Sequence, residues 1–420
     1  MGASGDEPSP PTSPSPAPQA AKVAALLLGV GIAAIAVWVY LRRSGNDPIV
    51  RFQQATSPLE ALYAERPQFA AAWKPAEAPP GHRHLIRFPI PERVAREIFP
   101  INVREQPWDE LTYMRHIPMR SDPIAMKEVP NGVWTMRTNS LGLREDAEPL
   151  AGKPDLRILV TGDSHTDGVC ENEASFPHVL QRELERSHPG KTIEALNAGK
   201  GSFTFYNYLG TIEKFLFLEP DVFIVAVYGP NDFAEVLPPY HYFEGTERKP
   251  GAAKYWDLVE KAIAIDRAWL AQDGLSLKYF QQHPDEVAVA LRASKEAAMD
   301  IQELCEAHGI RPVFVYLPGM LDTYRRSGAK DPELEGLAER LYGAIGLAPE
   351  DALVHDRMAD EFLAFLAERG IPTLDARTLF ARKSQRFYWL EDHHIDVSAQ
   401  QEIGRALAPI LDSAEAEKLR

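Results

Sequence analysis

Residues 157–165 read RILVTGDSH, a short apolar run that ends in a glycine, an aspartate and a serine. Branched apolar residues bounded by glycine are typical of a buried strand, so Ser164 is predicted to lie where that strand ends. A serine hydroxyl in this position is a candidate nucleophile. On its own it is inert at neutral pH, because it needs a base, an orienting carboxylate and hydrogen-bond donors for an oxyanion.

Short apolar runs and helix-like segments alternate from this stretch onward. The predicted strands are residues 157–161, 192–196, 222–228, 312–317 and 372–374, and the predicted helices are residues 176–187, 206–218, 285–308 and 356–369. Strands too apolar to face water, joined by helices, predict a parallel sheet that is covered on both faces. The expected fold class is α/β, with a three-layer α/β/α arrangement around a mostly parallel five-stranded sheet.

Three polar segments are predicted to meet at one edge of this sheet. Ser164, the turn at residues 197–201 and the block at residues 229–232 each follow a predicted strand. Sites in open parallel sheets form at the carboxyl ends of the strands. We therefore expect these three segments to share one site.

The composition excludes several classes of protein. The 420 residues carry a net charge of -15, which argues against a nucleic-acid partner because such a partner requires clustered Lys and Arg. Cys170 and Cys305 are the only cysteines, and neither a zinc-type spacing nor a C-x-x-C pair is present. We expect no metal and no cofactor, and a small or neutral substrate.

The N-terminal residues predict a membrane anchor. Residues 1–20 are rich in Pro and Ser and predict a disordered tail. Residues 21–43 are the predicted transmembrane helix, since no charged residue occurs from Val23 to Leu41 and an apolar helix of this length crosses a bilayer. The other interpretations are a buried soluble helix and a cleaved signal peptide, but the apolar core is too long for a signal peptide and lacks a small-residue cleavage site.

The orientation of this anchor stays open at the sequence level. Lys22 precedes the span, whereas Arg42, Arg43 and Arg51 follow it, which mildly favours a cytoplasmic C-terminal domain. Long C-terminal domains nevertheless cross membranes despite a weak charge bias.

The remaining chain divides into a linker and a catalytic region. Residues 44–150 contain many prolines and are predicted to be a linker or wrapping region, in which residues 133–144 predict a short strand and a turn. Residues 151–413 are the predicted catalytic domain, with an insertion at about residues 233–284. This insertion begins beside Asn231, so it is either a lid over the site or a peripheral helical decoration.

Four sequence blocks, taken in order, resemble a known family. They are Gly162-Asp163-Ser164, Asn197-Ala198-Gly199-Lys200-Gly201, Gly229-Pro230-Asn231-Asp232 and Asp392-His393-His394. In order and type they resemble the SGNH (GDSL) hydrolase superfamily, and the lead-in at residues 138–144 resembles the segment before the nucleophile in its bacterial members. The resemblance implies an SGNH-hydrolase, flavodoxin-like fold and a catalytic domain on the extracytoplasmic side of the membrane.

The resemblance also implies a role for each catalytic residue. Ser164 would be the nucleophile, His394 its base, and Asp392 the acid that orients the imidazole. The backbone N–H groups of Ser164 and Gly201 and the side-chain amide of Asn231 would hold the oxyanion.

Departures from the family pattern leave alternatives open. The commonest spacing puts the acid three residues before the histidine, at Glu391, and the glycine block has Ser202 where the pattern ends in glycine. The reserve candidates are Glu391 for the acid, His393 for the base and Gly199 for the amide donor.

The residues around the nucleophile also have structural interpretations. Ser164 could simply cap the helix that follows the strand. Asp163 is expected to accept backbone N–H groups in the turn, and His165 is expected to be exposed near the substrate.

Three functions from different classes fit these residues. The first is a serine esterase that hydrolyses O-acyl esters, with acetyl favoured, of a carbohydrate or a lipid. The second is an O-acyltransferase that modifies a cell-envelope polysaccharide with the same triad. The third is a non-catalytic binding protein on the same fold, and intact Ser164, Asn231 and His394 argue against it.

Overall fold

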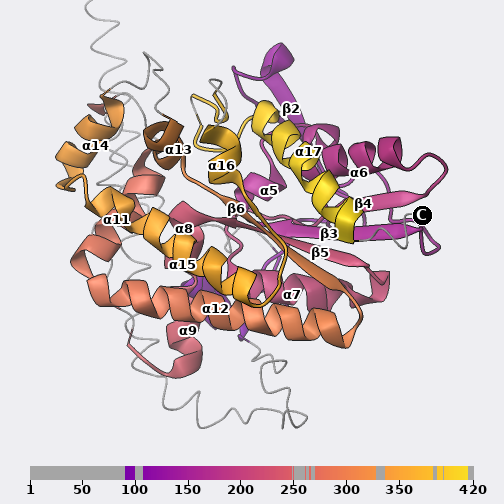
Figure 1. The fold of residues 1–420 in the computed structure, drawn as a ribbon, viewed down its shortest axis with the longest axis horizontal. Helices are drawn as coiled ribbons and strands as arrows, with labels where there is room; N and C mark the ends of the chain where they lie inside the picture. Colours follow the sequence, from indigo (N-terminus) through magenta and orange to yellow (C-terminus); the bar gives the residue numbers. More distant parts are fainter. Residues whose placement is uncertain are drawn as a thin grey trace, which may run out of the picture. The chain divides into compact units, whose positions relative to one another are not determined.

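The computed structural model describes most of the chain from Ile90 onward (Figure 1). The described residues are 90–99, 107–247, 249, 261, 264–265, 270–327, 336–381, 386–390 and 392–414. The predicted tail and the predicted membrane span at residues 21–43 lie outside them, as does Glu391. Among the helices of the described residues, none is long and apolar enough to cross a membrane.

A five-stranded sheet lies at the centre of the described structure. Its strands, in spatial order, are β4 (Ile193–Asn197), β3 (Leu156–Gly162), β5 (Val222–Tyr228), β6 (Arg311–Leu317) and β7 (Thr373–Asp375). All neighbouring strands are parallel. Every residue of β3, β4 and β5 is buried, as expected for strands covered on both faces. The predicted parallel sheet is confirmed.

Helices cover both faces of this sheet (Figure 1). The first layer holds α6 (Phe176–Ser187) and α17 (Val397–Ala414), which pack against each other, and the second holds α7 (Phe205–Phe215), α12 (Pro284–Ala307) and α15 (Val354–Glu368). Apolar residues three to four positions apart form the buried side of α6. The predicted helix at residues 206–218 ends early as α7, because a 3-10 turn at Leu216–Leu218 follows it.

The other helices are short or lie at the ends of the sheet. They are α4 (Glu92–Ile98), α5 (Ser164–Asp167), α8 (Gly229–Glu235), α9 (Leu237–Glu244), α11 (Leu270–Gln282), α13 (Met320–Ser327), α14 (Leu337–Ile345) and α16 (Ala376–Ala381). The 3-10 turns at Pro130–Gly132, Asn172–Ala174 and Asp351–Leu353 complete the set of helical elements in the described residues. The block at residues 229–232 is therefore the first turn of α8, not a loop.

A small antiparallel hairpin precedes the main sheet. It pairs β1 (Ser121–Ala125) with β2 (Val133–Arg137), which confirms the strand predicted at the start of residues 133–144. Trp134 of β2 packs with Val129 and Trp389. The Glu128 carboxylate accepts the Leu390 backbone N–H at 2.7 Å, so the hairpin contacts the segment that leads to Asp392.

The strand order determines where a site forms. Counted along the chain, the order is 2-1-3-4-5, the flavodoxin-like arrangement, whose crevice lies at the carboxyl ends of the first and third strands. Those strands are β3 and β5, which are paired neighbours. Ser164 follows β3 and Asn231 follows β5, so the two residues flank this crevice.

Candidate active site

The nucleophile turn joins β3 directly to α5. Asp163 is the N-cap residue of α5, and its carboxylate accepts the His165 backbone N–H at 2.9 Å. A Cβ on Gly162 would lie 2.0 Å from Thr166 Oγ1 and 2.9 Å from the Ala226 carbonyl oxygen, so this close approach requires glycine. Burial raises the pKa of Asp163 to about 6. The prediction that Asp163 shapes the turn is confirmed.

Ser164 is half-buried at the first position of α5. A backbone N–H at this position has no acceptor within its own helix, and no described residue accepts it. Gly201 lies beside the serine, since a Cβ built on Gly201 would be 3.7 Å from Ser164 Cβ. The nucleophile candidate is therefore partly exposed and has an unused backbone donor.

Asp392 and His394 form a hydrogen-bonded pair in the loop before α17. Asp392 Oδ1 accepts the His394 backbone N–H at 2.8 Å and also contacts Nδ1 of the same histidine. That contact holds the imidazole proton on Nδ1 and leaves the lone pair of Nε2 for a proton transfer. Burial opposes a charge on His394, but the charge and the hydrogen bond of Asp392 raise the pKa of His394 above its ordinary value.

His393 lacks such a partner. It forms no hydrogen bond with a described residue, and burial together with the charge of His394 lowers its pKa to about 3. The structure thus pairs Asp392 with His394 and not with the reserve base.

The Asp392–His394 pair lies against the turn that carries Ser164. The ring centroid of His394 is 4.9 Å from that of His165, the residue directly after Ser164. The Nε2 atom of His394 is buried and has no hydrogen-bond partner among the described residues, so the bond from Ser164 Oγ is not formed in this structure. Catalytic hydrogen bonds of this kind commonly tighten only when substrate is bound.

Comparison with known proteins gives a likeness in solved structures alone. No family model and no curated protein matches the chain. A structure described as a lipolytic protein of the G-D-S-L family from Desulfitobacterium hafniense DCB-2 matches with a TM-score of 0.34 and 14% identity, over 60% of this chain and 98% of that chain. TesA matches with a TM-score of 0.34 and 14% identity, over 61% of this chain and 98% of its own. The acetyl xylan esterase AlAXEase matches with a TM-score of 0.34 and 12% identity, over 62% of this chain and 99% of its own.

Asn231 connects the end of β5 to the nucleophile turn. Its Nδ2 atom donates to Asp163 Oδ2 at 3.2 Å. A side-chain amide carries two N–H groups, so one of them stays available for an oxyanion.

The glycine loop differs from the sequence prediction. The Gly201 N–H donates to Asp167 Oδ2 at 3.2 Å, and the Gly199 N–H donates to Asn197 Oδ1 at 2.9 Å. Neither the predicted amide nor the reserve amide is therefore free in this structure, because side-chain oxygens already accept both. Ser164 and Asn231 supply the open donors.

Asp167 is a buried residue of α5 that the sequence analysis did not single out. Its Oδ1 atom contacts His116 Nε2 at 3.1 Å and accepts from Arg144 Nη1 at 3.1 Å. Burial opposes its charge, but the hydrogen bond with His116 and the charge of Arg144 hold the pKa of Asp167 well below its usual range. The partners lie 51 and 23 positions away in sequence, so no local pattern reveals them. The lead-in at residues 138–144 ends at Arg144, and that resemblance was the available clue.

Arg144 is expected to be essential for stability. It is fully buried, and Arg144→Leu leaves the Asp167 carboxylate without its cation, which should lower the free energy of unfolding by about 3 to 5 kcal/mol. Urea unfolding followed by circular dichroism measures this loss. Arg137→Leu is the matched control, because Arg137 is 32% exposed and its ion pairs with Asp146 and Glu171 should each contribute about 1 kcal/mol or less. Equal losses in the two variants would contradict the role of Arg144.

The prediction that His165 is exposed is wrong. Its side chain is fully buried and stacks on Tyr228, with ring centroids 3.7 Å apart. Burial and the charges of His394 and His393 hold the pKa of His165 well below its ordinary value, so the ring stays neutral. The physical reason is that the His165 ring lies between Tyr228 and the segment after His394, where its Nδ1 atom accepts the Ile395 N–H.

Side chains able to bind a cation gather at one place in the described part of the chain. Ring nitrogens of His165, His393 and His394 lie within 4.8 Å of one another. The Ile395 N–H donates to His165 Nδ1, so the proton of this neutral ring is on Nε2 and no lone pair faces a cation there. The lone pair of His394 Nε2 accepts no hydrogen bond from a described residue. Among the three rings, the described residues give only His394 a carboxylate partner, Asp392, which suits that ring to proton transfer.

A second Ser-His-Asp set lies at α11. Ser276 Oγ is 2.9 Å from His355 Nε2, and His355 Nδ1 is 3.3 Å from Asp322 Oδ2. Their exposures are only 5%, 1% and 3%. These residues come from α11, α15 and α13, so the set joins three helices. Because the serine is buried, the set offers no hydroxyl to a substrate.

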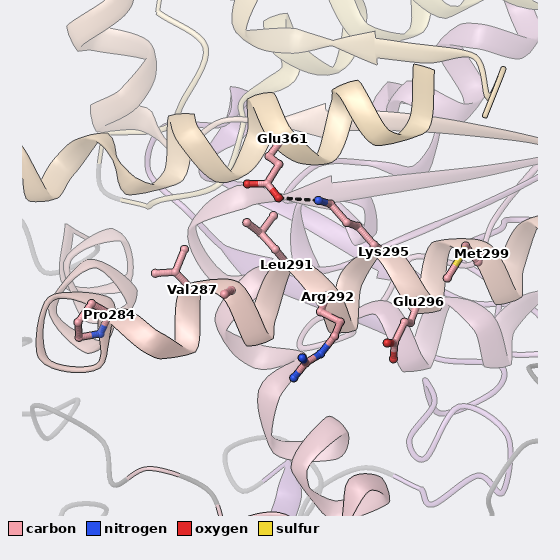
Figure 2. Close-up of a pocket in the computed structure, with 9 residues that line it drawn as sticks. Pro284, Val287, Leu291, Arg292, Lys295, Glu296, Met299 and Glu361 are labelled. Carbon is pink, nitrogen blue, oxygen red and sulfur yellow. Dashed lines mark hydrogen bonds and ion pairs between the residues drawn. The ribbon is translucent and has the colours of Figure 1, made fainter. Parts of the chain in front are cut away.

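A surface pocket of about 490 Å³ lies along α12, and no triad residue lines it. Figure 2 shows Lys295 of α12 reaching Glu361 of α15, an ion pair of 2.6 Å. Arg292 of the same wall donates to the Tyr240 hydroxyl at 3.0 Å. Lys295, Glu361 and Arg292 are thus engaged in contacts between helices.

Proposed function

We propose that this protein is a serine esterase that hydrolyses O-acyl esters through an acyl-enzyme on Ser164. The observation that supports this most is the Asp392–His394 pair, which lies against the nucleophile turn with the His394 Nε2 atom unbonded. A base, its orienting carboxylate and a partly exposed serine are the parts that acyl transfer needs.

The proposed reaction has two half-reactions. His394 Nε2 takes the hydroxyl proton as Ser164 Oγ attacks the acyl carbonyl, and the resulting oxyanion accepts hydrogen bonds from the Ser164 N–H and Asn231 Nδ2. His394 then returns the proton to the leaving alcohol as the ester C–O bond breaks. A water molecule attacks the acyl-enzyme with the same base, releasing the carboxylic acid and restoring the serine.

The substrate class and the location extend this proposal. We propose that the substrate is an O-acyl ester of a carbohydrate or a lipid, and that the preferred acyl group is acetyl. The resemblance of the four sequence blocks supports this substrate class. We also propose that residues 21–43 anchor the chain in a membrane, with the catalytic domain on the extracytoplasmic side. The uncharged run from Val23 to Leu41 supports the anchor, and the resemblance supports the orientation.

Covalent labelling tests the proposed nucleophile directly. The full chain treated with a fluorophosphonate is expected to carry one adduct on the peptide with Ser164, because an activated serine reacts with this class of probe. Ser276 provides an internal comparison, since it is buried within a similar Ser-His-Asp set. Peptide mass mapping that finds no adduct on Ser164, or finds it on Ser276 instead, would reject the proposal.

A further inference from the structure

His165 forms two hydrogen bonds to the segment that carries the base. Its Nδ1 atom accepts the Ile395 backbone N–H at 3.3 Å, and its carbonyl oxygen accepts Gln400 Nε2 at 3.0 Å. Ile395 directly follows His394, just as His165 directly follows Ser164. The residue next to the nucleophile thus holds the residue next to the base.

The His165 ring is itself held in place. It stacks on Tyr228 at the end of β5, and the Tyr228 hydroxyl donates to Asp273 Oδ1 at 3.0 Å. Gln400 continues the connection to the next helix, because its Oε1 atom accepts the Phe176 N–H at 2.8 Å. These contacts leave the imidazole little freedom to rotate.

The opposite side of the base segment is held by backbone bonds. Trp389 N donates to the His394 carbonyl oxygen at 3.1 Å, and Asp396 N donates to the Phe387 carbonyl oxygen at 2.9 Å. The Ile395 N–H points away from this pairing and toward His165. Ile395 is 1% exposed, so without His165 its N–H would be buried and unsatisfied, which is unfavourable.

We propose that His165 is a positioning residue, which keeps His394 aligned with Ser164 by accepting the Ile395 N–H. This rests on the proposed esterase function. The ring suits the role because it is buried and neutral, so Nδ1 can remain an acceptor. A misplacement of a catalytic group by about 1 Å is enough to reduce a rate by about 100-fold.

Two substitutions separate the hydrogen bond from the packing. His165→Asn keeps an acceptor oxygen near the place of Nδ1 but loses the ring, whereas His165→Phe keeps a ring for Tyr228 but loses the acceptor. We expect kcat for an acetyl ester to fall about 10- to 100-fold in His165→Phe, with KM within about twofold, because alignment affects the chemical step and not binding. His165→Asn should stay within about fivefold of the parent, as a rescue by the retained acceptor. If His165→Phe fails to fold, His165→Met provides the same loss of acceptor.

Hydrogen exchange at Ile395 gives a readout that does not depend on activity. The amide should exchange slowly in the parent and in His165→Asn, and faster in His165→Phe. A kcat of His165→Phe equal to or above that of His165→Asn would overturn the inference, since the ring's packing on Tyr228, and not its acceptor atom, would then account for the effect of His165 on kcat. A parent that neither hydrolyses esters nor labels at Ser164 would reject the proposed function, whereas an active parent with unchanged Ile395 exchange in His165→Phe would reject the positioning role.

Discussion

Ser164→Ala is expected to reduce kcat for p-nitrophenyl acetate by about 10³-fold or more, while the far-ultraviolet circular dichroism stays that of the parent. The acyl-enzyme cannot form without the Oγ atom, and the residual rate would come from binding and the oxyanion donors alone. Ser164 is half-buried and its side chain makes no hydrogen bond with a described residue, so its removal should not disturb the fold. Release of p-nitrophenolate measures the rate.

The control for this variant is Ser276→Ala, which makes the same change in the buried Ser-His-Asp set of α11. Ser276 is hydrogen-bonded to His355, which has no role in the proposed mechanism, so hydrolysis should continue at the parental rate. A Ser164→Ala variant that hydrolyses as fast as the parent would show that the serine mechanism is wrong.

Asp392→Asn is expected to lower kcat by about 10²- to 10⁴-fold and to move the acidic limb of the pH profile to lower pH. His394 acts as a base only when neutral, so activity is lost as the pH falls through its pKa. Burial opposes the charged imidazole, and the Asp392 carboxylate outweighs it, so the parental limb should lie above the ordinary imidazole value. Removal of the carboxylate leaves burial as the larger effect, which lowers the pKa of His394. Profiles of kcat/KM against pH measure both effects.

Glu391→Gln is the matched control, because it removes a carboxylate one position earlier in the chain. We expect this variant to keep the acidic limb of the parent and most of its kcat. A larger rate loss in Glu391→Gln than in Asp392→Asn would transfer the acid role to Glu391.

Much of the fold follows from local patterns. Each predicted strand is found within one residue of its predicted ends, and α6 coincides with the predicted helix. Buried parallel strands leave a strong local pattern, because all their residues avoid water and glycine or proline bounds them. The block at residues 229–232 was predicted less well, since the same Gly and Pro that suggest a turn also begin α8.

The candidate site was only partly predictable. The contact between Asp392 and His394 could be predicted, because the two residues are two positions apart and lie within one loop. The hydrogen bonds of the Gly199 and Gly201 amides could not be predicted, since their acceptors, Asn197 and Asp167, depend on how separate turns are placed.

The sequence by itself therefore determined the parallel sheet, the edge at which polar residues gather, and the Ser164, Asp392 and His394 candidates. Periodic apolar runs and short spacings are local properties, and they persist whatever the rest of the chain does. Only the tertiary structure decided that Asp167 accepts the Gly201 N–H and that the buried Arg144 is the cation paired with Asp167. It also decided that His165 is buried beneath the loop that carries His394. Burial and hydrogen-bond partners depend on segments brought together from distant parts of the chain, and a buried charge or N–H is tolerated only where those segments supply its partner.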